Sequence, residues 1–213
     1  MTEFWKILIG IKSAADEANV KIVTGDTKVV EKGKGDKIFI NTSGVGKVHE
    51  RAQISIHNVK AGDKIIVSDS IATHGAAIMS VREGLEFETA VKSDTRGLNH
   101  IVSTLLDEFG KDIHLLKDPT RGGIATVLNE IARDRNHGVK ISQKQIPIQN
   151  EVSALCEILG LDPLYVANEG IFIAIVDSRI SEKFVKKLKS MDYGTNASIC
   201  LLYTSPSPRD ATL

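Results

Sequence analysis

Helical and strand patterns alternate along the chain from residue 64 to residue 190. A strand pattern covers residues 64–68, and residues 171–176 form an unbroken apolar run, typical of a strand buried on both faces. The mixture of elements predicts an α+β class, or an α/β class with a mixed sheet. Apolar side chains at helical spacing predict helices at residues 74–83, 97–109, 124–131, 151–159 and 181–190.

The first part of the chain has a different pattern. Apolar residues at steps of three to four predict a helix over residues 4–18, and strand patterns follow at residues 22–30 and 37–42. Two short strands cannot cover the apolar face of this helix as a whole sheet would. The chain is therefore expected to begin inside a domain, with an unpaired sheet edge and an exposed apolar face near residues 4–46.

Two domains and a separate tail are expected. The boundary is placed near residue 60, which gives an incomplete first domain over residues 1–60 and an α/β domain over residues 61–199. Residues 200–213 have no helical or strand period, and they are similar to a translated sequencing adapter. We interpret them as a non-native tail and assign no chemistry to Cys200; the alternative is a genuine flexible tail.

The composition excludes several classes of protein. Lys+Arg and Asp+Glu both number 27, so no net charge draws the chain to nucleic acid or to an acidic membrane. No apolar run approaches the ~20 residues of a membrane helix, and no basic-then-apolar leader is present. Two cysteines cannot build a disulfide scaffold and are typical of a reducing compartment. We expect a cytoplasmic protein with no nucleic-acid or membrane partner.

The apolar run from Ile22 to Val30 is interrupted by four residues suited to a polyanion. Gly25 permits close approach of the backbone, and Asp26 can hold a hard cation such as Mg²⁺. Thr27 adds a hydroxyl, and Lys28 can neutralise a phosphate. A polar turn between two strands is the alternative interpretation, and the segments described next favour the functional one.

A second candidate site is the run from Asp118 to Gly123, which opens directly into a predicted helix. Its glycines expose backbone amides at the positive end of the helix dipole, and Thr120 can cap them. Arg121 adds a bidentate donor for phosphate or carboxylate. The same residues could instead serve only to cap the helix.

Two further candidates lie at the mouths of predicted strands. Glu169 precedes the buried strand and is followed by glycine, so it is a candidate for a partly desolvated base. His74 lies at a strand-to-helix turn. A turn residue is the alternative for Glu169, and a structural role is the alternative for His74.

Taken together, these segments resemble the hydrogenase-maturation carbamoyl dehydratase family, which belongs to the aminoimidazole ribonucleotide synthetase-like superfamily. The resemblance covers residues 1 to about 199. The segments that carry it are residues 22–30, 39–42, 118–130 and 161–170. It implies a two-domain architecture and a homodimer that binds Mg-ATP near the pairing of its first domains.

The resemblance also implies a reaction and its partners. The family converts a carbamoyl group on its own C-terminal cysteine into a thiocyanate, with ATP. A carbamoyltransferase loads the carbamoyl group, and a maturation complex that builds the iron centre of nickel–iron hydrogenase receives the cyano group. The resemblance assigns the binding of Mg-ATP to Gly25, Asp26 and Thr27, and contact with phosphate to Arg121. It assigns charge stabilisation to Lys28 and the acceptance of a proton to Glu169. Asp118 and His74 remain further candidates.

The chain departs from the family pattern in its turns and in its length. Asp69, Ala72 and Thr73 stand where the family has two glycines and an aspartate, which puts a metal- or tail-binding role of this turn in doubt. The family's N-terminal portion and terminal cysteine are absent, so we expect the chain to be inactive as written. The alternatives are a selenophosphate synthetase-like or thiamine-phosphate kinase-like protein, or a non-catalytic module that docks maturation partners.

Overall fold

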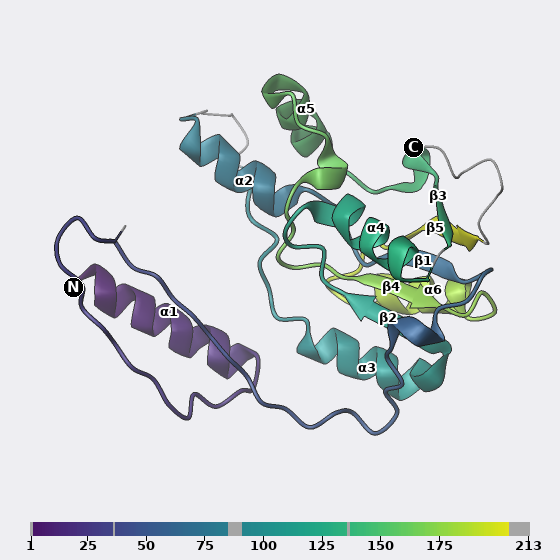
Figure 1. Ribbon diagram of the computed structural model, residues 1–213, viewed down its shortest axis with the longest axis horizontal. Helices are drawn as coiled ribbons and strands as arrows, with labels where there is room; N and C mark the ends of the chain where they lie inside the picture. The colour runs from purple at the N-terminus through teal and green to yellow at the C-terminus, as the bar shows by residue number, and fades with distance from the viewer. Residues whose placement is uncertain (1, 36, 85–90, 136, 205–213) are drawn as a thin grey trace. The chain divides into compact units, whose positions relative to one another are not determined.

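The structure is a computed structural model that describes residues 2–35, 37–84, 91–135 and 137–204 (Figure 1). The chain divides into two compact units, Met1–Glu50 and Arg51–Leu213. Among the described residues, no helix combines the length and the apolar character that a membrane crossing requires.

The first unit consists of one helix and irregular chain. Helix α1 spans Glu3–Glu17, which confirms the predicted helix, and none of its side chains is buried. The predicted strands at residues 22–30 and 37–42 are wrong, because the described part of this unit has no strand. An extended segment becomes a strand only when a neighbour satisfies its backbone groups. Here no neighbour does so, and Val23 and Phe39 are 86% and 80% exposed.

The second unit contains a five-stranded sheet with the order β2-β4-β1-β5-β3. Every neighbouring pair of strands is antiparallel. The predicted α+β class is confirmed, with an antiparallel sheet in place of a mixed one. The strands are β1 (Lys64–Val67), β2 (Ile113–Lys117), β3 (Gly138–Ile141), β4 (Ile173–Val176) and β5 (Ser198–Thr204).

Helices cover both faces of this sheet, and α4 and α3 lie on opposite sides of it (Figure 1). Short 3₁₀ turns lie at Ile56–Asn58, Gly110–Asp112, Gln143–Gln145 and Pro163–Tyr165. The predicted helices are confirmed as α2 (Thr73–Arg82), α3 (Asn99–Phe109), α4 (Gly123–Arg135), α5 (Asn150–Leu159) and α6 (Ser181–Lys189).

Alternation along the central strands separates the two cores. Ile65 and Val67 pack into one apolar cluster with α2, α4 and α5, whereas Ile66 packs into a second cluster with α3 and α6. In the second cluster the rings of Phe109 and Phe184 lie 5.3 Å apart between centroids. The unbroken apolar run that predicted a strand buried on both faces therefore supplies β4, whose residues are all buried.

Strand β5 corrects the expectation that the chain has no regular structure from residue 200 onwards. It extends to Thr204 and pairs with β1 on one edge and β3 on the other. Ladder hydrogen bonds on both edges stabilise this strand, and its own sequence pattern does not reveal them. The rest of the expected tail, residues 205–213, lies outside the described residues.

Candidate functional site

Three of the turns predicted from sequence meet at one end of the sheet. Val67 and Lys117 both pair with Ile173, so the ends of β1 and β2 lie beside the beginning of β4. The turns that follow β1 and β2 and the turn that precedes β4 are residues 69–75, 118–123 and 167–170; we call them together the three-turn site.

Asn168 joins the three turns through its side-chain amide. Its Oδ1 atom accepts a 2.7 Å hydrogen bond from the backbone N–H of Ala72. Its Nδ2 atom donates 3.0 Å bonds to the carbonyl oxygens of Pro119 and Val166. The side chain is almost wholly buried, so these bonds replace water on both ends of the amide. Sequence reasoning placed Asn168 beside Glu169 without giving it a role.

Two glycines allow the turns to approach one another closely. The N–H of Gly75 donates a 3.0 Å bond to the carbonyl oxygen of Ala167, and a Cβ atom at Gly75 would lie 2.4 Å from a methyl of Val166. Gly123 has φ +60°, and a Cβ atom there would lie 2.4 Å from the carbonyl oxygen of Leu164. Only residues without a side chain fit at these positions.

The predicted site residues of the second unit are at the surface of this arrangement. Glu169, Asp118 and Arg121 are exposed, and His74 is half-buried. Glu169 alternates with the buried Asn168 and Gly170, which is why its side chain points outward. The structure of this unit thus shows a solvated carboxylate in place of the partly desolvated one expected.

The expected cap on helix α4 is also different in detail. The hydroxyl of Thr120 donates a 3.2 Å bond to the carboxylate of Asp118, and the N–H of Gly123 reaches the Thr120 carbonyl oxygen at 3.4 Å. The Thr120 side chain therefore holds the Asp118 side chain in the turn, and the guanidinium of Arg121 is exposed beside it.

Residues 93–96, which sequence reasoning missed, connect this site to its surroundings; we call them the 93–96 segment. Asp94 Oδ1 accepts a 3.3 Å bond from the N–H of Glu169, and Arg96 Nε donates a 2.7 Å bond to the carbonyl oxygen of Gly170. The Nδ1 atom of His74 lies 2.8 Å from the hydroxyl of Ser93. The polar run before α3 signals a helix start, but nothing in it indicates pairing with residues 169 and 170.

Two of the three departures from the family pattern, Asp69 and Ala72, have identifiable structural effects. Asp69 forms an ion pair with Arg96 at 3.1 Å, and its other oxygen accepts bonds from Asn196 Nδ2 and the N–H of Ser70. Both carboxylate oxygens are thus engaged within the protein. Ala72 adopts φ +68°, a left-handed conformation in which glycine is less strained than alanine by about 1 kcal/mol or more.

The candidates in the first unit are Gly25, Asp26, Thr27 and Lys28, all of them exposed. Asp26 Oδ1 accepts a 2.8 Å bond from the N–H of Thr27, and the Asp26 side chain is exposed. A carboxylate and a hydroxyl are hard oxygen donors of the kind that Mg²⁺ prefers, so the chemistry of these two residues fits that ion. Among the described residues, no group of three or more His, Cys, Asp or Glu side chains is arranged to hold a metal by itself.

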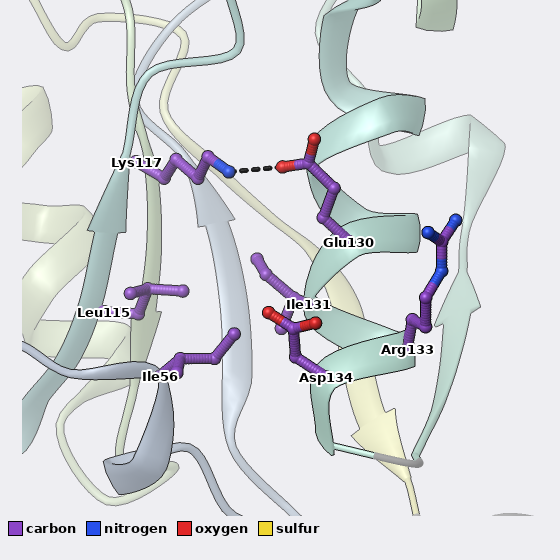
Figure 2. A pocket seen from close by; sticks show the side chains of 7 residues that line it. All are labelled: Ile56, Leu115, Lys117, Glu130, Ile131, Arg133 and Asp134. Carbon is purple, nitrogen blue, oxygen red and sulfur yellow. Dashed lines mark hydrogen bonds and ion pairs between the residues drawn. The ribbon is translucent and has the colours of Figure 1, made fainter.

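A separate cavity of about 300 Å³ lies between β2 and α4 (Figure 2). Ile56, Leu115 and Ile131 form its apolar part, and an ion pair between Lys117 and Glu130 borders it. None of the residues predicted from sequence to bind or react lines this cavity. It is therefore not part of the three-turn site.

Both cysteine thiols are buried. Burial raises the pKa of Cys200 to about 11, and burial together with Asp162 raises the pKa of Cys156. Because the thiolate is the reactive form, we expect iodoacetamide at pH 8 to alkylate Cys200 about 100-fold more slowly in the native protein than in urea, and to alkylate Cys156 more slowly as well. Mass spectrometry of quenched samples measures both rates. A native rate for Cys200 equal to its rate in urea would contradict its buried place in β5.

Comparison with known proteins defines the class. Residues 60–199 match the family described as AIR synthase related protein, C-terminal domain, and residues 1–48 match the corresponding N-terminal domain. The carbamoyl dehydratases HypE of Bradyrhizobium diazoefficiens and Azotobacter vinelandii are each 44% identical to the chain. The matches cover 87% and 93% of this chain and 54% and 58% of those proteins. The chain thus spans about half the length of the curated relatives it matches.

Solved structures agree with this assignment. A HypE–HypF complex contains a chain with 44% identity and a TM-score of 0.92, covering 96% of this chain and 67% of that one. A HypE solved in complex with ATP has 41% identity and a TM-score of 0.92, covering 97% of this chain and 62% of that one. A thiamine-monophosphate kinase with 15% identity and a TM-score of 0.52 shares the fold alone. The chain belongs to the HypE family of hydrogenase maturation proteins.

Proposed function

We propose that this chain takes part in the ATP-dependent dehydration of a cysteine-bound carbamoyl group to a thiocyanate, which supplies the cyanide ligand during nickel–iron hydrogenase maturation. Membership of the HypE family supports the proposal, as does the name carbamoyl dehydratase given to its relatives. A relative was solved with ATP bound, which supports ATP as the phosphoryl donor.

The observation that carries the proposal is the junction made by Asn168. Its bond to the Pro119 carbonyl holds the turn of Glu169 against the turn of Arg121, although the two turns are far apart in the sequence, and its bond to the Ala72 N–H adds the third turn. A carboxylate and a guanidinium at one end of a sheet can serve proton transfer and phosphate binding, the two tasks that this reaction sets.

The chemistry explains why these tasks arise. A carbamoyl oxygen is a poor leaving group, and ATP makes it a better one by phosphorylating it. Loss of both nitrogen protons and departure of phosphate then leave the nitrile. We assign the proton acceptor to Glu169 and the neutralisation of phosphate charge to Lys28 and Arg121. Gly25, Asp26 and Thr27 would hold ATP, with Asp26 as the ligand of Mg²⁺.

The partners and the location are part of the same proposal. We infer a homodimer that acts in the cytoplasm. A carbamoyltransferase would load the substrate, and the complex that builds the iron centre would receive the product. The solved complex of a relative with HypF supports a protein partner in maturation.

A chimaera tests the assignment of Glu169. Residues 1–199 would replace the matched segment of the Azotobacter vinelandii relative, and ATP-dependent conversion of its carbamoylated cysteine would be followed by mass spectrometry. We expect Glu169→Gln to slow conversion by about 100-fold or more, the usual contribution of a general base. ATP affinity, measured by calorimetry, should stay within twofold.

Glu157→Gln is the matched control, because Glu157 is exposed on α5 outside the three-turn site. It should leave conversion unchanged. Conversion by the Glu169→Gln chimaera at the parental rate would refute the base assignment. The same assay on the 213-residue chain tests the further prediction that it is inactive alone. If the parental chimaera binds no ATP, a module that only docks partners becomes the better interpretation.

A further inference from the structure

We propose that Arg96 is a positioning residue that fixes the turn of Glu169, and that Asp69 holds Arg96 in place for this task. The inference rests on the proposed function, because it concerns the residue assigned there as proton acceptor. Neither Arg96 nor its pairing with Asp69 was apparent from the sequence.

Arg96 makes two directed contacts with different partners. Its Nε atom donates to the carbonyl oxygen of Gly170 at 2.7 Å, and its terminal nitrogen pairs with Asp69 at 3.1 Å. The guanidinium carbon lies 5.2 Å from the ring centroid of Tyr193. A planar guanidinium with several donors can bridge two acceptors and stack on a ring at the same time, and a lysine ammonium lacks that geometry.

The pair is shielded from solvent. The side chains of Arg96 and Asp69 are 18% and 13% exposed, so salt and water weaken the interaction less than at an open surface. Asn196 Nδ2 donates a 2.9 Å bond to the remaining Asp69 oxygen and thereby limits the positions that Asp69 can take. Arg96 consequently has one well-defined orientation toward Gly170.

The position of the turn that carries Glu169 depends on the contact between Arg96 and Gly170. Among the described residues, no hydrogen bond or ion pair holds the carboxylate of Glu169, so its location is set by its backbone. That backbone is fixed by Asn168 before it, by the bond from the Glu169 N–H to Asp94, and by Arg96 after it. The approach is tight, because a Cβ atom at Gly170 would lie 1.6 Å from the carbonyl oxygen of Asp94.

The 93–96 segment holds the turn at some cost in stability. Asp94 Oδ2 is buried, and within the described part of the chain it has no hydrogen-bond partner. A buried oxygen without a partner lowers stability. Among the same described residues, Arg135 Nε, at the end of α4, is also buried without a partner, so the role of the 93–96 segment rests on its contacts with residues 169 and 170.

The full chain can be tested by NMR without any turnover. Arg96→Gln removes the positive charge and the several N–H donors of the guanidinium group. We expect this variant to speed amide hydrogen exchange at Glu169 about tenfold and to shift the Glu169 ¹³Cδ resonance. The amides of Ile65 and Ile175 in the central strands should change less than twofold. Equal acceleration of all these amides would show a global loss of stability and would overturn the proposal.

Three further variants sharpen the result. Asp69→Asn should act in the same direction as Arg96→Gln but more weakly, and the double variant should match Arg96→Gln within twofold, because Asp69 acts through Arg96. Arg96→Lys should restore less than half of the protection, since lysine cannot bridge both acceptors. Additive effects in the double variant, or full restoration by lysine, would refute the mechanism.

Arg179→Gln is the matched control. Arg179 also engages an aspartate through a guanidinium fork, with 2.8 Å bonds from Nε and a terminal nitrogen to Asp177, but it does not contact the three-turn site. It should leave the Glu169 signals unchanged. The NMR measurements need no catalysis, so the two proposals can fail separately. If Arg96→Gln loosens the turn as expected but the Glu169→Gln chimaera remains active, only the proposed function is overturned. An unaltered turn in Arg96→Gln would overturn the role of Arg96 alone.

Discussion

Replacement of Asn168 by alanine is expected to lower the free energy of unfolding of the second unit by about 4 kcal/mol. The substitution removes three hydrogen bonds and leaves the N–H of Ala72 and the carbonyls of Pro119 and Val166 without the amide that satisfies them. Each polar group left unpaired in the interior costs about 1–3 kcal/mol. A donor costs more than a carbonyl, which often finds a second partner.

Urea unfolding followed by far-UV circular dichroism measures this effect. Fluorescence is unsuitable, because the one tryptophan, Trp5, belongs to the first unit. Asn129→Ala is the control, since the Asn129 side chain makes one intrahelical bond to the carbonyl oxygen of Ala125. It should change stability by less than about 0.5 kcal/mol, because alanine favours the helix. Equal losses for Asn168→Ala and Asn129→Ala would show that the three turns do not depend on Asn168.

Gly123→Ala is expected to destabilise the same unit by about 4 kcal/mol, or to prevent its folding. The added methyl would lie 2.4 Å from the carbonyl oxygen of Leu164 and 2.8 Å from that of Val166. Both atoms belong to the main chain and cannot rotate away, so a backbone shift must accommodate the methyl. The left-handed φ of +60° adds about 1 kcal/mol of strain.

Gly160→Ala separates these two contributions. Gly160 ends α5 with φ +64°, nearly the same conformation, and a Cβ atom there meets nothing within 4 Å. It should cost only the strain, about 1 kcal/mol. The difference between the two variants in urea measures the clash. If Gly123→Ala and Gly160→Ala lower the free energy of unfolding equally, the close contact between Gly123 and residues 164–166 does not exist in solution.

Local patterns predicted the helices well because each pattern reports a property of its own segment. In α4, apolar side chains recur at positions 124, 127, 128 and 131, and all of them are buried. Strands depend on neighbours. Residues 22–30 were predicted to form a strand and residues 138–141 were not, yet of these two described segments only the second has a strand partner.

The candidate site could be predicted only in pieces. The runs ending in Gly75, Gly123 and Gly170 each indicated a special turn, and the structure gives each glycine a close backbone approach. That these turns meet follows from the strand register, which no local pattern reports. Arg96 was missed for the same reason, because its two partners are 27 and 74 positions away.

The position of β5 in the sheet orders the folding of the second unit. In the sheet, β5 lies between β3 and β1 and pairs with both. In the chain, α5, β4 and α6 are synthesised after β3 and before β5. While the chain is emerging from the ribosome, β3 therefore waits without its ladder partner, and both β1 and β3 present open edges. We expect closure of this long loop to complete the sheet late in folding, and we expect aggregation and chaperone capture to compete most strongly before it closes.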